Sequence, residues 1–144
     1  MLDLFNFASI LAGFLILIIG FGLHFIGQLI SVLNWDLAVR MGMAEKGILR
    51  EYLTYENAMA LTDVAIGWIY LPIGIGLILG LGWSYNLAFI PGVIFIYHSI
   101  SFFFWTGNQE REGNVYYTQT KRVSWFLLNF ISGIIILIVA LSPY

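Results

Sequence analysis

Residues 8–33 read ASILAGFLILIIGFGLHFIGQLISVL, and His24 is the sole ionisable side chain in this run. A helix needs about 20 mostly apolar residues to cross the hydrocarbon core of a bilayer. In hydrocarbon every backbone N–H and C=O must find its partner within the segment, so such a run is predicted to be a transmembrane helix. Three more runs meet this length, at 57–81, 85–105 and 123–141. The sequence therefore predicts an all-α membrane protein, with four transmembrane helices in an antiparallel bundle and a single integral membrane domain over residues 1–144.

The composition supports the bilayer as the environment of the chain. Hydrophobic residues make up 60% of it and charged residues 10%, against about 25% charged residues in an ordinary soluble domain. Cysteine is absent, which excludes disulfide exchange, thiolate metal sites and iron–sulfur clusters. The first residues lack the basic region and the small-residue cleavage pattern of a signal peptide, so the first apolar run is expected to be a permanent helix. The lipid bilayer is the expected partner, and no nucleic-acid partner is expected.

The basic residues predict the orientation of the chain. All six lie in the two segments 34–56 and 107–122, and they are Arg40, Lys46, Arg50, Arg111, Lys121 and Arg122. Lys and Arg are enriched in cytoplasmic loops of membrane proteins. We therefore expect both segments to be cytoplasmic and both termini to be non-cytoplasmic.

The connections between the runs contain further local signals. In segment 34–56, apolar residues at helical spacing predict two short interfacial helices in this first cytoplasmic loop, broken near Gly42 and Gly47. A tight turn is expected around Trp83, Ser84 and Asn86. Pro72 has no N–H to donate to the carbonyl of Trp68, so the second run should be kinked above Asp63.

Three ionisable residues lie inside the predicted spans: His24, Asp63 and His98. Such residues are costly in a membrane and usually face the interior of a bundle or a cavity. With a rise of about 1.5 Å per residue, both histidines lie roughly 10 to 14 Å from the cytoplasmic ends of their helices. We therefore expect them to lie at one level.

Helical spacing places further polar residues on the same faces as these three. The predicted polar cluster, in the cytoplasmic half of the bundle, consists of His24, Gln28, Asp63, Tyr70, His98, Ser101 and Asn129. One interpretation is that these groups only hydrogen-bond to one another and fix helix packing. The other is a pocket that binds or transports a small molecule, a lipid or a proton, with Asp63 as the charge partner.

Alternative functions remain open. Because His24 and His98 lie at equal depth, they could also be the two axial ligands of a b-type haem. A metal site from His24, Asp63 and His98 has no diagnostic spacing, because its ligands come from three helices, and no metal ligand is assigned. An enzyme acting on a lipid-like substrate, with Asp63 or Glu56 and a histidine as acid and base, has no supporting motif. Glycine stripes such as Gly13, Gly20 and Gly27, or Gly76 with Gly80, would also suit a homo-oligomer or a subunit of a larger membrane complex.

Overall fold

The computed structural model describes the backbone of residues 2–142 and the side chains of residues 6–142, so Met1, Pro143 and Tyr144 lie outside it. The described residues are helical and contain no strand. The first helix is continuous but changes its hydrogen bonding along its length, as α1 (Leu2–Leu15), the π-helix η1 (Ile16–Gly27) and α2 (Gln28–Leu33). After the short α3 (Trp35–Arg40) come α4 (Arg50–Gly67), α5 (Tyr70–Ile78), α6 (Gly82–Arg111) and α7 (Gln119–Leu141).

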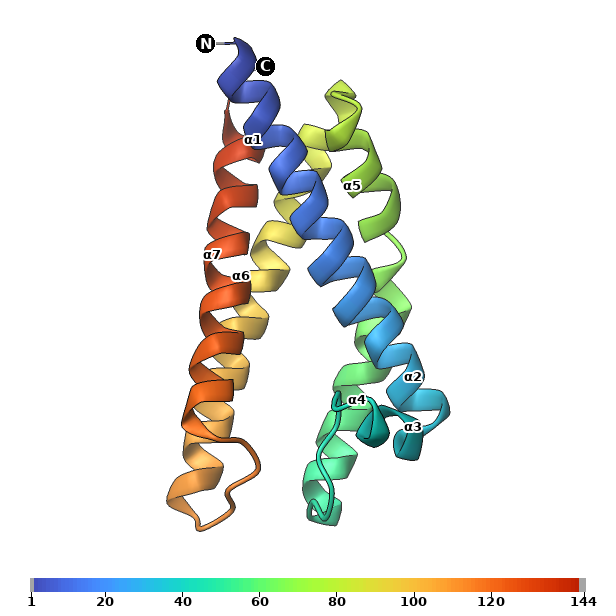
Figure 1. Ribbon diagram of the computed structural model, residues 1–144, viewed down its shortest axis with the longest axis vertical. Helices are drawn as coiled ribbons and strands as arrows, with labels where there is room; N and C mark the ends of the chain where they lie inside the picture. The colour runs from blue at the N-terminus through green and yellow to red at the C-terminus, as the bar shows by residue number, and fades with distance from the viewer. Residues whose placement is uncertain (1, 143–144) are drawn as a thin grey trace.

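The helices are those of a multi-pass integral membrane protein. Within the described chain, residues 6–33, α6 and α7 are each long and apolar enough to cross a membrane, and the bent pair α4–α5 makes a fourth candidate. The chain runs up and down between two ends of the molecule (Figure 1). The start of α1 and the last turn of α7 lie on one side of the molecule. The segments 34–49 and 112–118 lie on the opposite side, which we call the loop end.

The structure corrects two local predictions. Of the two short interfacial helices, only α3 forms, because residues 50–53 are already the first turn of α4. The breaks at Gly42 and Gly47 are confirmed, and both glycines have a positive φ that L-residues rarely adopt. The predicted turn around Trp83 is also wrong. The chain turns at Gly80, with φ +67°, and Trp83, Ser84 and Asn86 belong to α6.

The predicted kink is confirmed, although the helix breaks before the proline. The axes of α4 and α5 differ by 48°. Pro72 lies in the first turn of α5, where its missing N–H costs little. Its ring would clash with the carbonyl of Trp68, four residues earlier, if the helix continued through that residue. The break at Trp68 and Ile69 accommodates both constraints.

Glycines hold the helices together at the end opposite the loops. A Cβ added to Gly13 would lie 2.7 Å from the Gly74 carbonyl oxygen, and one added to Gly133 would lie 2.8 Å from the Gly92 carbonyl oxygen. These distances mean that α1 meets α5, and α6 meets α7, backbone to backbone. Gly20 packs closely on the side-chain ring of Tyr70. These glycines therefore contact the chain's own helices.

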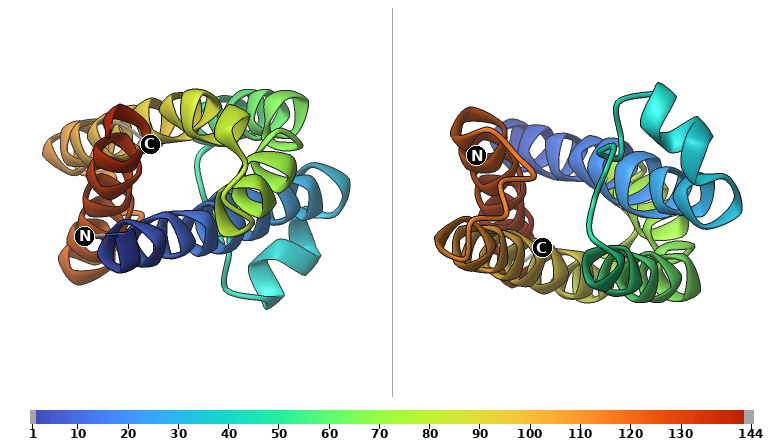
Figure 2. Two further views of the ribbon diagram at one scale, coloured as in Figure 1. Left: turned by 90° about the horizontal axis from the view of Figure 1, so that it is seen from above. Right: turned by 90° about the horizontal axis from the view of Figure 1, so that it is seen from below.

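The buried apolar core lies in this glycine-packed half, around Ile16, Tyr70, Leu77, Phe95 and Ile136. Toward the loop end the helices form two pairs, α2 with α4 and α6 with α7, and the two pairs diverge (Figure 1). Viewed from the loop end, segment 41–49 runs across this end of the molecule from α3 to α4 (Figure 2). The fold is thus closed at one end and divided at the other.

Candidate functional site

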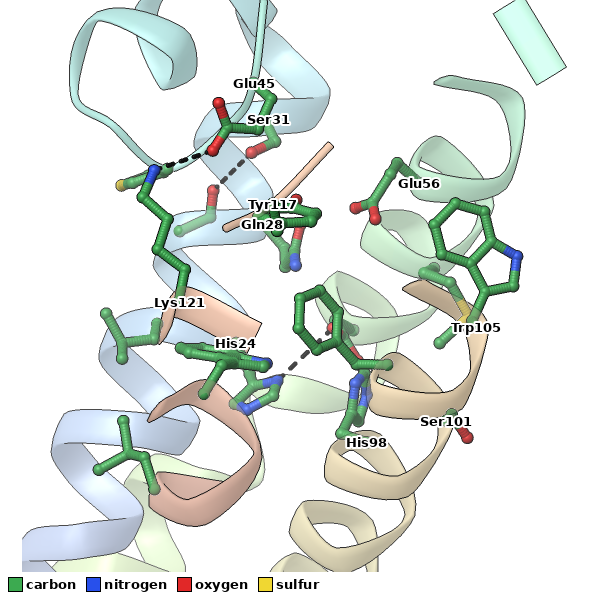
Figure 3. A pocket seen from close by; sticks show the side chains of 18 of the residues that line it. His24, Gln28, Ser31, Glu45, Glu56, His98, Ser101, Trp105, Tyr117 and Lys121 are labelled. Atoms are coloured by element: carbon green, nitrogen blue, oxygen red, sulfur yellow. Dashed lines mark hydrogen bonds and ion pairs between the residues drawn. The ribbon is translucent and has the colours of Figure 1, made fainter. Parts of the chain in front are cut away.

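A cavity of about 470 Å³ lies between the two helix pairs. Its walls come from η1 and α2, α4, α6 and α7, and segment 41–49 contributes Gly42, Met43 and Glu45 at the loop end. His24 and His98 lie at its inner end (Figure 3). Asp63 lines the cavity beside them, and we call the three residues the triad. Volumes of about 300 to 1,000 Å³ are typical of sites for small molecules and cofactors. The structure therefore combines the three predicted ionisable residues with a cavity of ligand size.

Asp63 lies between the two histidines. Its Oδ1 is 2.9 Å from His98 Nε2, which is hydrogen-bonding distance, and its Oδ2 is 3.7 Å from His24 Nδ1. Asp63 is 1% exposed and His24 is 2% exposed, whereas His98 keeps 15% of its side chain accessible at the cavity. The two imidazole rings meet edge to face with centroids 4.7 Å apart. The triad is thus a compact group at the base of the cavity.

Residue spacing on α4 and a glycine contact explain how Asp63 and His24 come together. On α4 the buried face follows Ala60, Asp63 and Gly67 at steps of three and four residues. A Cβ on Gly67 would lie 2.9 Å from Phe25 Cβ, so this glycine lets η1 approach α4 one turn beyond Asp63. His24 lies in η1, and π-helical segments frequently occur at functional sites.

Asn129 determines which nitrogen of His24 carries a proton. Its Nδ2 donates to the Trp125 carbonyl oxygen (3.0 Å), which turns its Oδ1 toward His24 Nε2 at 2.8 Å. An amide oxygen only accepts hydrogen bonds, so His24 Nε2 must be the donor. In a neutral imidazole the other nitrogen, Nδ1, is then an acceptor. This nitrogen faces Asp63.

The predicted cluster is largely, but not wholly, brought together. Gln28 and Ser101 line the cavity with the triad, although Ser101 lies on the side of α6 away from His24 (Figure 3). Asn129 lies behind His24 as its hydrogen-bond partner and does not line the cavity. Tyr70 is not a cavity residue. It is fully buried in the apolar core against Phe95, and its hydroxyl has no partner among the described residues.

The outer part of the cavity is formed by residues that the sequence analysis did not assign to a site. The Lys121 ammonium donates to Glu45 Oε1 (2.9 Å), which joins segment 41–49 to α7. Tyr117 accepts a hydrogen bond (3.0 Å) from Tyr52, which does not itself line the cavity, and Tyr55 stacks on Trp105 with centroids 4.8 Å apart. A signal for part of this group exists in the sequence. Positions 52, 55, 56, 59 and 63 form one helical face, which becomes visible only if the helix begins at Arg50.

Tyr117 stays neutral at the mouth of the cavity. Burial raises the pKa of its hydroxyl to about 12, and the charge of Glu56 adds to this, whereas the hydrogen bond from Tyr52 acts in the opposite direction. The hydroxyl is therefore available as a hydrogen-bonding group at every physiological pH.

The geometry argues against a haem between the two histidines. Axial ligands bind iron from opposite faces of one flat macrocycle, but the imidazoles of His24 and His98 are in direct edge-to-face contact and share Asp63. There is no room between the rings for a macrocycle.

Comparisons with known proteins give no independent assignment. No protein-family model matches the chain, and neither curated proteins nor solved structures match it significantly. The function must therefore be argued from the triad and the cavity.

Proposed function

We propose that the chain crosses the membrane four times as an antiparallel bundle, with the loop end in the cytoplasm and both termini on the other side. The proposal is supported by the basic residues, all of which lie in or beside the loop-end segments. In this orientation the cavity opens toward the cytoplasm and the inner leaflet. The glycine-packed half then closes the outer side.

Single cysteines test this orientation, because the chain has none of its own. Met59 lines the cavity, whereas Thr62, one turn further along α4, is exposed on its outer surface. We expect a charged methanethiosulfonate reagent to modify Met59→Cys in inside-out vesicles and to leave Thr62→Cys unmodified, since the reagent reacts in water and Thr62 faces lipid. The extent of labelling is read by mass spectrometry. Modification of Met59→Cys only in right-side-out vesicles would reverse the orientation.

We further propose that the cavity binds an amphipathic small molecule or lipid taken from the cytoplasmic side, with its polar head at the triad. The observation that carries this proposal is the position of the triad at the base of a cavity of ligand size. Besides polar and charged residues, its walls include the apolar and aromatic side chains of Met59, Phe102, Trp125 and Leu128, which are available to a hydrocarbon chain. Ligand sites commonly combine mostly apolar walls with a few convergent polar groups.

Native mass spectrometry tests this binding with hexadecanol as the added probe, because its hydroxyl can donate a hydrogen bond to the Asp63 carboxylate. We expect one bound probe molecule per wild-type chain. Met59→Trp should lose it because the indole fills the cavity, and Asp63→Asn should weaken it because the head loses its charged partner.

Thr62→Trp is the matched control, since it places the same indole on the outer face of α4. It should bind the probe as the wild type does. Equal adducts on Met59→Trp and Thr62→Trp would show that the probe binds the lipid-facing surface instead, and absence of any adduct on the wild type would remove the proposal.

A further inference from the structure

Two buried acceptors face each other at the base of the cavity. His24 Nδ1 and Asp63 Oδ2 are 3.7 Å apart, and neither has a hydrogen-bond partner among the described residues. Asn129 holds the proton of a neutral His24 on Nε2 and so keeps Nδ1 free of one. Buried polar atoms almost always have a partner, and an unpaired one destabilises the fold. Two lone pairs that face each other leave room for a group that binds both, and a metal cation is such a group.

We propose that the triad binds a divalent transition-metal ion through His24 Nδ1, Asp63 Oδ2 and His98 Nε2. One potential ligand atom from each residue lies within 4.8 Å of the other two. In a tetrahedral site, ligand atoms about 2.1 Å from the ion lie about 3.4 Å apart. The widest pair of the triad would therefore have to close by up to about 1.4 Å, and His98, with 15% of its side chain exposed, is the least enclosed of the three residues.

The surroundings of His24 are those of a metal ligand. Histidines that bind metal through one nitrogen usually donate the other N–H to a carboxylate or a carbonyl, which fixes the ring and its tautomer. Asn129 accepts this hydrogen bond from His24 and is itself held by the Trp125 carbonyl. The imidazole also stacks on Phe95, with centroids 5.4 Å apart. Asn129 is therefore a positioning residue for the metal ligand.

The donor set selects the class of ion. Two imidazole nitrogens and one carboxylate suit zinc and divalent iron, whereas calcium and magnesium prefer oxygen ligands. His98 Nε2 now lies 2.9 Å from Asp63 Oδ1, and a metal ion bound to Nε2 would replace this hydrogen bond, with the N–H of the neutral imidazole on Nδ1 instead. With three protein ligands, the remaining coordination positions of the ion would face the cavity. The inference thus rests on the proposed function and deepens it, because an oxygen atom of the ligand head would bind there.

Cobalt absorption and zinc competition test the site in the full chain, purified with a tag that contains no histidine and stripped with a chelator. We expect one Co²⁺ per chain, with visible d–d bands that Zn²⁺ abolishes, and a parallel anaerobic titration with Fe²⁺ identifies the preferred ion. Asp63→Asn should lose this binding, and His24→Ala should lose it too. Asn129→Ala should weaken it by about 10- to 100-fold, and Asn129→Asp, which keeps an acceptor for His24, should restore much of it.

Asp36→Asn is the control, since Asp36 is an exposed carboxylate on α3, and it should bind cobalt as the wild type does. A folded wild type without stoichiometric Co²⁺ or Zn²⁺, or undiminished binding by His24→Ala, would overturn the metal site. The lipid-probe experiment is read separately. Probe binding without metal binding leaves the proposed function intact and rejects only the ion.

Discussion

Asp63→Leu is expected to destabilise the folded protein by about 3 kcal/mol or more, because it breaks a buried charged network by removing one partner. His98 loses the acceptor of its Nε2–H, and His24 stays buried among apolar rings. Unfolding in mixed micelles with increasing sodium dodecyl sulfate measures the change in free energy. The exposed-site variant Asp36→Leu should stay within about 0.5 kcal/mol of the wild type.

A combined variant separates a functional triad from a purely structural one. Replacement of the whole network by apolar residues of similar size, as His24→Phe, Asp63→Leu, His98→Phe and Asn129→Leu, should recover most of the stability that Asp63→Leu loses. Buried ionic groups can often be replaced together in this way at little cost. Full recovery without metal or probe binding would show that the network serves function. A combined variant as unstable as Asp63→Leu would favour the packing interpretation instead.

Gly133→Ala is the second variant with a large expected effect, a loss of about 3 kcal/mol. Its new Cβ would lie 2.8 Å from the Gly92 carbonyl oxygen and 3.2 Å from the Ile96 nitrogen. Because these atoms belong to the backbone of α6, the helices must move apart. The same micellar unfolding assay measures the loss.

Gly107→Ala is its matched control on α6, since a Cβ at Gly107 meets only the Arg122 guanidinium at 4.0 Å. Alanine is the better helix former, so this variant should be neutral or gain up to about 1 kcal/mol. If both variants behaved alike, close backbone packing would not be what holds α6 and α7 together.

The spans and the triad were predictable because they depend on local composition and on helical period. Runs of apolar residues reveal the helices, and a charge inside such a run reveals a buried site. His24, Asp63 and His98 stand out for this reason, and the structure brings all three together. Pro72 predicted the bend by the same kind of local argument.

The π-helix, the position of Tyr70 and the partners of two aromatic residues depend on contacts between helices, which the local sequence does not reveal. Isoleucine, leucine and phenylalanine suit an α-helix and a π-helix alike, so nothing in residues 16–27 distinguishes η1 from its neighbours. Tyr70 shares a helical face with Asp63, but the break at Trp68 and Ile69 redirects α5 and puts its ring in the core. Trp105 and Tyr117 have stacking and hydrogen-bond partners on α4, which is distant in sequence, so their place at the cavity could not be predicted from their neighbours in the chain.

The contrast between the divided loop end and the glycine-packed end has an electrical consequence in the proposed orientation. Moving one elementary charge across a whole membrane involves about 2.3 kcal/mol per 100 mV. Water in the cavity would carry the cytoplasmic potential inward to the triad, so most of the voltage would fall across the closed half, in which Gly13 contacts Gly74. A cation that reaches Asp63 from the cytoplasm would therefore cross little of the field, and its affinity should depend only weakly on membrane voltage.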